Sequence, residues 1–177
     1  MLNNIEELTE FFPSSNLNNF SFYFYCPSLK EEEKREMSEI IIKNKGVSSE
    51  ELLEVLVSAQ PGIDRAEALA ALKERENKMT TGIIPGIAVP HAISNSVKGV
   101  VGAIGISRNG IDFGSLDNKP VHVVFMLLFS PNETERHLQI MKQFAGLLHH
   151  QELCNSLVKA KSAEEICDLI CSCEKSM

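Results

Sequence analysis

The chain has 177 residues, of which 44% are hydrophobic, and its formal net charge is −7 with a sequence pI near 5.3. This length fits one domain with a single core, and the acidic balance argues against nucleic acid as the main partner, because binding to the phosphate backbone requires a basic face. The sequence contains no run of about 18 apolar residues, so we expect no membrane insertion.

The chain begins with a polar segment, residues 1–19, that we expect to be loosely held. It carries Glu6, Glu7 and Glu10 where a secretory signal would have basic residues, so we expect no export. The five cysteines are then expected to be reduced thiols of a cytoplasmic protein.

The first predicted elements are a strand and a helix. The aromatic run at 20–25 favours a strand, because aromatic side chains suit a pleated surface. Ser28 and Glu31 have the spacing of a capping box. This pattern predicts a helix that carries the isoleucines at 40–42 toward Gly46.

Two further helices are predicted before residue 80. The capping signature recurs at Ser48 ahead of a leucine-rich segment, and Pro61-Gly62 ends that helix. Alanine and leucine at helical spacing predict a third helix from about Asp64 to Arg75.

The next segments change from helical to extended patterns. Residues 80–90 contain two glycines and two prolines and are predicted to form a loop with a short strand. A strand is predicted at 97–107, and Asn109-Gly110 predicts a turn after it. The nearly continuous apolar run at 121–129 is typical of a strand that is buried on both faces.

The C-terminal part returns to helical patterns. Asn132 and Glu135 predict the start of a helix that continues to Leu148, and Ser162 with Glu165 predicts the start of the last helix. Strands that alternate with helices indicate an α/β layer fold.

One histidine stands in an unusual setting. His91 leaves a short apolar strand directly after Pro90, which fixes its own φ and drives Val89 toward extended geometry. Gly82 and Gly86 allow the preceding loop a close approach and would leave backbone N–H groups to meet an anion. Imidazole is substantially neutral near pH 7 and keeps one lone pair, so His91 is suited to nucleophilic attack on phosphorus.

Two more residues are candidates to stabilise a phosphoryl group on His91, which would carry about two negative charges. Arg75 ends a helix just before the loop, and its guanidinium can hold two phosphate oxygens. His137 opens the helix after the buried strand, where ligand crevices of α/β folds form. It would donate a hydrogen bond to a phosphate oxygen and stabilise a loose, in-line transition state.

These residues also carry a resemblance to a known family. The sequence resembles the enzyme IIA domain of the fructose/mannitol/nitrogen-regulatory class, or type 2, of the bacterial phosphotransferase system over about residues 64–170. The matching motifs are Arg75-Glu76, Thr80-Thr81-Gly82-Ile83, Gly86-Ile87-Ala88-Val89-Pro90-His91, Gly110-Ile111-Asp112-Phe113, Asp117-Asn118-Lys119-Pro120-Val121 and His137-Leu138.

The resemblance implies a single α/β domain with a mixed β-sheet flanked by helices on both faces. We place this domain at 28–177, after an N-terminal extension and first strand at 1–27. The implied phosphorylation site is the tele nitrogen of His91, with His137 and Arg75 as phosphate-stabilising residues. The implied donor is the phosphorylated histidine phosphocarrier protein, which enzyme I charges from phosphoenolpyruvate.

The resemblance implies no cofactor and no metal. The Thr-Gly-Ile loop, and a sequence without a fused membrane or enzyme IIB domain, favour the nitrogen-regulatory branch.

The remaining histidines and the cysteines have structural interpretations. His122 starts an apolar strand and is expected to be structural or partly exposed, while His149-His150 would complement a helix dipole or face solvent. The cysteine spacing near the C-terminus matches no zinc pattern and favours core packing or incidental thiols. These cysteines are Cys154, Cys167, Cys171 and Cys173.

Three functional hypotheses follow from the residues and from what the resemblance implies. In the first, His91 is a phosphohistidine carrier for onward transfer to an enzyme IIB or for nitrogen-type regulation of target proteins. In the second, the domain is a regulatory interaction module whose binding depends on phosphorylation of His91, without onward transfer. The third is a metal-dependent hydrolase with His91 and His137 as ligands, for which the sequence offers no obvious third ligand.

Overall fold

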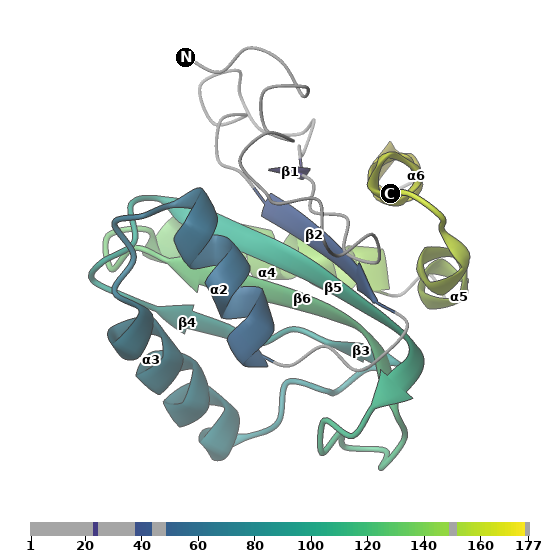
Figure 1. Ribbon diagram of the computed structural model, residues 1–177, viewed down its shortest axis with the longest axis horizontal. Helices are drawn as coiled ribbons and strands as arrows, with labels where there is room; N and C mark the ends of the chain where they lie inside the picture. The colour runs from purple at the N-terminus through teal and green to yellow at the C-terminus, as the bar shows by residue number, and fades with distance from the viewer. Residues whose placement is uncertain (1–22, 25–37, 44–48, 149–151, 176–177) are drawn as a thin grey trace, which may run out of the picture.

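The computed structural model, which describes residues 23–24, 38–43, 49–148 and 152–175, places a mixed sheet between two layers of helices (Figure 1). Its strands are β1 (Tyr23–Phe24), β2 (Ser38–Lys43), β3 (Ile87–Ala88), β4 (His91–Ile93), β5 (Val100–Ile111) and β6 (Val121–Phe129). Its helices are α2 (Ser49–Ala59), α3 (Arg65–Lys78), α4 (Thr134–Leu148), α5 (Leu153–Lys159) and α6 (Ala163–Lys175). The predictions for 1–19, for Ser28 with Glu31, for the cap at Ser48 and for His149-His150 lie outside the described residues.

The sheet is six-stranded in the order β1-β2-β5-β6-β3, and β4 also pairs with β6. Two of these pairings are antiparallel, β1 with β2 and β5 with β6. The other three are parallel: β2 with β5, β3 with β6, and β4 with β6. The predicted mixed sheet is therefore confirmed. β3 and β4 follow one another along β6, so together they form the edge of the sheet at that side.

The prediction of a helix that carries the isoleucines at 40–42 is wrong, because these residues lie in strand β2. They pair in parallel with β5, with Ile41 opposite Gly105. Consecutive β-branched side chains lose χ1 freedom in a helix and pack well on a pleated surface. The predicted strand at 20–25 is described only at Tyr23–Phe24, which pairs with β2 as β1.

The turn predicted at Asn109-Gly110 is also wrong, since β5 continues through it to Ile111. The register of β5 against β6 shifts between Ile106 and Ile111. Gly110 has φ +74°, and a Cβ there would lie 2.6 Å from Pro120 Cβ. The glycine therefore serves an irregularity inside the strand, and the chain reverses later, before Val121.

The other helix predictions hold, with different ends. Asp64 caps α3, and its carboxylate accepts from the N–H groups of Ala66 and Glu67 at 2.9 and 3.0 Å. Ser162 Oγ accepts from Glu165 N–H at 3.2 Å, which confirms the capping signature of α6. α4 begins at Thr134, beyond the predicted cap. α5 was not predicted, because it is short and begins without a side-chain cap.

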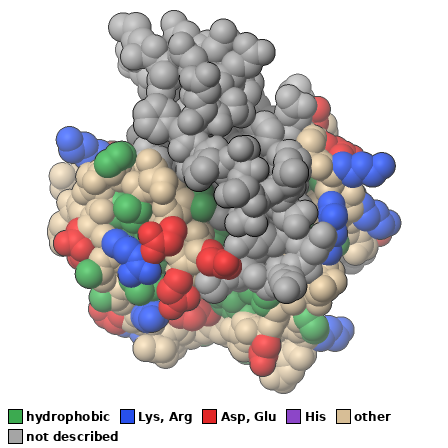
Figure 2. Space-filling model, in the orientation of Figure 1, with side chains coloured by type: hydrophobic (Ala, Val, Ile, Leu, Met, Phe, Trp, Pro, Cys, Tyr) green, Lys and Arg blue, Asp and Glu red, His purple; other side chains and the backbone are tan. Residues whose placement is uncertain are grey.

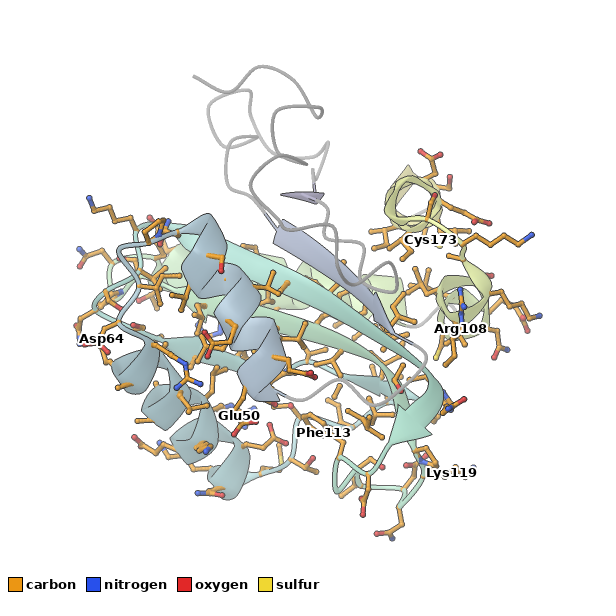
Figure 3. All side chains as sticks on the ribbon, in the orientation of Figure 1. Glu50, Asp64, Arg108, Phe113, Lys119 and Cys173 are labelled. Atoms are coloured by element: carbon orange, nitrogen blue, oxygen red, sulfur yellow. The ribbon has the colours of Figure 1, made fainter. Side chains whose placement is uncertain are left out.

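Helices cover both faces of the sheet in Figure 1, and a hydrophobic core lies on each face. Side chains of β6 alternate between them, so this strand is buried on both faces as predicted. The core under α4, α5 and α6 contains Phe125, Phe129, Leu157, Ile166 and Ile170, among others. The core under α2 and α3 contains Leu52, Leu53, Leu56, Leu72, Met126 and Leu128, among others. At the far end of β5, Arg108 Nη2 donates to Ala160 O at 3.2 Å, beside α5 in Figure 3.

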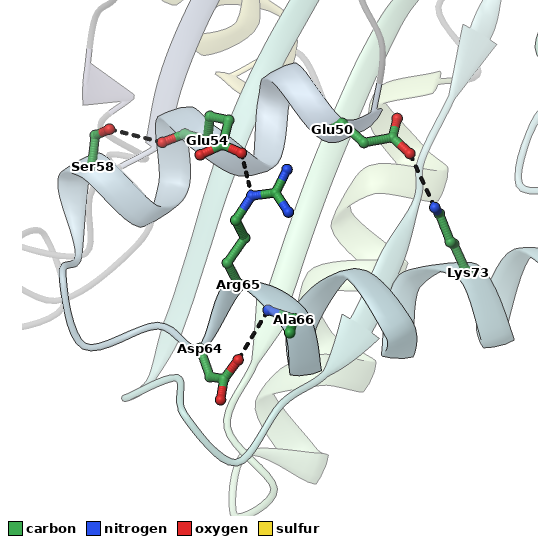
Figure 4. Close-up of polar contacts among 7 residues, drawn as sticks. All are labelled: Glu50, Glu54, Ser58, Asp64, Arg65, Ala66 and Lys73. Atoms are coloured by element: carbon green, nitrogen blue, oxygen red, sulfur yellow. Dashed lines mark hydrogen bonds and ion pairs between the residues drawn. The ribbon is translucent and has the colours of Figure 1, made fainter.

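The surface of α2 and α3 is of mixed charge. Figure 2 shows acidic and basic side chains interspersed over these helices. In Figure 4, Arg65 of α3 contacts Glu54 of α2, and Lys73 Nζ lies 3.1 Å from Glu50 Oε1. Solvent screens such exposed pairs, so the helices are held mainly by their buried leucines. None of the helices in the described ranges combines the length and apolarity that a bilayer crossing needs.

Candidate functional site

The structure brings together the three residues that the sequence singled out. Arg75 lies in the last turn of α3, His91 is the first residue of β4, and His137 lies in the first turn of α4. Arg75 Nε donates to His91 Nε2 at 3.3 Å, and the rings of His91 and His137 have centroids 5.6 Å apart. Three distant segments of the chain thus form one cluster at the sheet edge.

Strand pairing determines where His91 lies. β4 runs parallel to β6, with His91 opposite Leu127, and Leu127 N–H donates to Pro90 O at 2.9 Å. β6 then leads through a short loop into α4, which carries His137. The same strand that fixes the backbone at His91 therefore also places the helix of the second histidine.

The tautomer of His91 follows from its two ring contacts. Nδ1 lies 2.8 Å from Val89 O, and a carbonyl oxygen only accepts, so Nδ1 carries the proton. Nε2 then holds the lone pair, which accepts from Arg75 Nε. The sequence did not reveal the acceptor for the second nitrogen. It is a backbone carbonyl, for which no side-chain signal exists.

The surroundings of His91 favour its neutral form. Burial lowers the pKa of His91, the hydrogen bond to Val89 O opposes that shift, and the positive charges of Arg75 and His137 lower the pKa further. Burial also lowers the pKa of His137, followed by the charge of Arg75. A neutral imidazole with its lone pair on Nε2 is the nucleophilic form, so the lowered pKa and the tautomer of His91 both favour nucleophilic attack by Nε2.

This electrostatic setting gives a pH prediction for His91. We expect its ring to protonate below the ordinary histidine pKa of about 6.5, and Arg75→Gln should move the midpoint up because it removes a neighbouring positive charge. Because the folded-state pKa values of His91 and His137 are lowered, the free energy of unfolding should decrease as pH falls from about 6.5 through the folded-state values. NMR titration of the His91 ring measures the midpoint of its protonation, and a midpoint at or above the ordinary histidine pKa would contradict the pKa prediction.

A neighbour that sequence reasoning missed holds the His137 ring. Phe129 and His137 stack with centroids 4.2 Å apart and ring planes at 30°. Phe129 is fully buried as the last residue of β6. The sequence signal for this contact was the position of Phe129 at the end of the buried strand, just before the helix that carries His137.

The loop before His91 is held by close packing. A Cβ on Gly82 would lie 3.0 Å from Ser115 Cβ, and Leu116 N–H donates to Gly82 O at 2.8 Å. Gly82 N–H donates to Thr80 Oγ1 at 3.2 Å. Contrary to the prediction, this N–H group is therefore not free for an anion. The glycine is needed here because a second loop approaches it closely.

The remaining candidates lie outside this cluster of side chains. His122 Nδ1 lies 3.1 Å from Ser107 O, a structural contact. Cys154 and Cys173 pack against the hydrophobic core, and burial raises the pKa of the Cys154 thiol. The side chains of Cys167 and Cys171 lie outside the described residues. Within the described ranges, no group of three or more His, Cys, Asp or Glu residues is placed to hold a metal ion.

Comparison with known proteins identifies the family. Residues 35–173 match the family model of the phosphoenolpyruvate-dependent sugar phosphotransferase system, EIIA 2. The chain is 38% identical over 119 residues to the PTS system fructose-specific EIIA component of Haloferax volcanii, covering 67% of this chain and 77% of that protein. It is 31% identical over 121 residues to the nitrogen regulatory protein of Klebsiella oxytoca, covering 68% and 75%.

A longer relative is the fructose-specific EIIABC component of Bacillus subtilis, which is 36% identical over 121 residues, 68% of this chain. The chain spans only 19% of the length of that protein.

Solved structures agree with this assignment. The nitrogen regulatory protein IIA-Ntr from Neisseria meningitidis superposes with a TM-score of 0.66 at 29% identity, covering 74% of this chain and 91% of that one. Enzyme IIA mannitol from Escherichia coli, solved in complex with phosphorylated enzyme IIB mannitol, has the same fold, with a TM-score of 0.62 at 21% identity, covering 82% and 98%. With a match over most of its length, this chain belongs to the type 2 enzyme IIA family of phosphocarriers of the phosphoenolpyruvate-dependent sugar phosphotransferase system.

Proposed function

We propose that His91 accepts a phosphoryl group on Nε2 from the phosphorylated histidine phosphocarrier protein and passes it to an enzyme IIB. The observation that carries this proposal is the pair of contacts on the ring. Nδ1 is tied to Val89 O at 2.8 Å, which leaves the lone pair on Nε2 beside Arg75. Phosphorylation at Nε2 is the tele product. The expected place of action is the cytoplasm, where the phosphoenolpyruvate-charged donor implied by the family would be found.

In the transfer step, every bond, electron pair and proton is accounted for. The Nε2 lone pair forms the new N–P bond while the N–P bond of the donor histidine breaks. The donor ring carries a proton on its other nitrogen, so it leaves with that electron pair as a neutral imidazole, and its positive charge passes to the phosphorylated His91 ring. The proton on Nδ1 of His91 stays on the hydrogen bond to Val89 O. Before the attack, Arg75 Nε must leave the lone pair, and it is then placed to donate to a phosphate oxygen. His137, whose ring centroid lies 5.6 Å from that of His91, is near enough to donate to a phosphate oxygen as charge develops.

The exposed apolar side chains support a protein as the donor. In the described ranges, each exposed large hydrophobic residue lies in the loop after α3, in β4 or at the start of α4, or is hydrogen-bonded to that loop. Exposed apolar groups around a site favour docking of a protein. They are Met79, which accepts from Arg75; Ile83, after Gly82; Ile93, in β4; Leu116, which donates to Gly82; and Leu138, after His137.

Regulation by the phosphorylation state is the second candidate, because relatives of both kinds are similar to this chain. The Klebsiella oxytoca and Neisseria meningitidis proteins are named as nitrogen regulatory proteins, whereas the Haloferax volcanii protein is a fructose-specific component. Two added charges at His91 would change partner binding at the same surface. Loss of the phosphoryl group to a cysteine of an enzyme IIB would establish onward transfer, and retention with changed partner binding would establish regulation.

The test of carrier chemistry is incubation with phosphoenolpyruvate, enzyme I and the histidine phosphocarrier protein, followed by intact mass at neutral and at acid pH. We expect the addition of one phosphoryl group at neutral pH and its loss in acid, because a phosphohistidine N–P bond is acid-labile. No mass gain from a donor mixture that phosphorylates another type 2 enzyme IIA would overturn the proposal.

His137→Ala should leave uptake possible but slow and should impair onward transfer. The ring lies edge-on to His91 and is only half-buried, so we expect a decrease of about 10- to 100-fold, at or below the effect of a fully enclosed oxyanion donor. Stopped-time phosphorylation and transfer to enzyme IIB measure both steps. Glu135→Ala, an exposed change in the same helical turn, is the control, and equal rates in both variants would remove His137 from the site.

A further inference from the structure

We propose that Glu76 is a positioning residue for His91, acting through Thr81 and Val89. The inference rests on the proposed function for its consequence in transfer, but the positioning itself is measurable on the unphosphorylated protein. Glu76 follows Arg75 in the last turn of α3 and is half-buried.

Both carboxylate oxygens of Glu76 bind one residue. Oε1 accepts from Thr81 N–H at 2.7 Å, and Oε2 accepts from Thr81 Oγ1 at 2.7 Å. Thr81 is buried, so its polar groups depend on this carboxylate. Charge-assisted bonds of this length are strong, and two of them fix the position of Thr81 relative to α3.

Thr81 in turn holds the residue that sets the tautomer. Thr81 O accepts from Val89 N–H at 3.2 Å, and Val89 O accepts from His91 Nδ1 at 2.8 Å. The hydrogen bonds therefore run without a break from Glu76 to the ring of His91. The Val89 carbonyl selects the ring nitrogen that keeps its proton, and the contacts of Glu76 and Thr81 hold that carbonyl in place.

This support is needed because His91 lies in the edge segment of the sheet. β6 pairs with the segment on one side, at Ala88 and at His91. Val89 directs its N–H to Thr81 and its carbonyl to the His91 ring. An edge segment that is paired on one side only is less constrained, and here Thr81, bound to Glu76, completes the constraint.

Glu74, on the same helix, has no such connection to the loop before His91. Glu74 is exposed and forms an ion pair with Lys78, with Oε1 2.8 Å from Nζ. Solvent screens that pair, and both of its partners belong to α3, so it does not connect the helix to the loop. Glu74 thus offers a control with the same charge on the same helix.

The experiment compares Glu76→Ala, Glu76→Gln and Glu74→Ala in the full chain. The ¹⁵N shifts of the His91 ring, read at a pH where it is neutral, report the tautomer, and phosphorylation by the histidine phosphocarrier protein reports the rate. In Glu76→Ala we expect the Nε2–H form to appear and the uptake rate to fall by about tenfold or more, as for orienting partners of metal-binding histidines. Glu76→Gln keeps an acceptor for Thr81 and should restore the Nδ1–H form and most of the rate, whereas Glu74→Ala should match the wild type.

A wild-type tautomer and rate in Glu76→Ala would overturn the proposal. If that variant does not fold, Thr81→Val replaces it, since it removes the Oγ1 contact alone and should shift the tautomer in the same direction. The two proposals fail separately. A wild-type chain that takes up no phosphoryl group would sink the proposed function, while the tautomer comparison would still decide the role of Glu76.

Discussion

Replacing His91 with alanine is expected to abolish phosphoryl uptake. The variant lacks the Nε2 lone pair that must form the new bond. Intact mass after incubation with phosphoenolpyruvate, enzyme I and the histidine phosphocarrier protein should show no added phosphoryl group. This is the largest effect we expect from any single substitution, because it removes the reacting atom itself.

Loss of uptake in this variant must be separated from loss of fold. His91→Gln offers a second replacement whose side-chain oxygen can still accept from Arg75, so it should preserve the local contacts while removing the nucleophile. Thermal unfolding of both variants checks that the domain is intact. If either variant took up an acid-labile phosphoryl group with the stoichiometry of the wild type, the acceptor would be another histidine.

The second large effect is expected from Arg75→Ala, which should slow phosphoryl uptake by about 10²- to 10³-fold, the cost of removing one oriented donor from a developing charge. The guanidinium lies 3.3 Å from Nε2 of His91, and Nη1 holds Met79 O at 2.9 Å, so it is already oriented toward the reacting atom. The decrease should lie in the maximal rate, since the contact strengthens as the phosphoryl group arrives.

Two variants make the Arg75 result specific. Arg75→Lys keeps a positive charge but not the planar fork, so it should recover only part of the rate. Lys78→Ala removes an exposed positive charge from the same last turn of α3 and should leave the rate unchanged. A decrease in Lys78→Ala equal to that in Arg75→Ala would mean that the helix end acts only through its net charge.

The candidate site residues could be named from sequence because their chemistry lies in side chains within contiguous motifs. The glycine, proline and histidine pattern that ends at His91 singled out the candidate nucleophile, and a position at a helix end singled out Arg75 and His137 as candidates. The Val89 carbonyl was not predictable in this way, since every residue has one. Neither was the pairing of Glu76 with Thr81, because both oxygens of a glutamate in a helix have many possible partners until the loop is placed.

The sequence by itself determined the elements that carry a strong local period or cap. The buried strand β6 was predicted with its observed ends, and α2, α3 and α6 were predicted from their caps and apolar spacing. Tertiary structure decided the rest. Residues 40–42 became a strand because β5 offered a partner, and β5 continued through Asn109-Gly110 to Ile111, which pairs with Val121 at the start of β6. Propensity and caps act between near neighbours in the chain, whereas strand pairing, the tautomer of His91 and the meeting of three distant segments depend on contacts that form only when the sheet does.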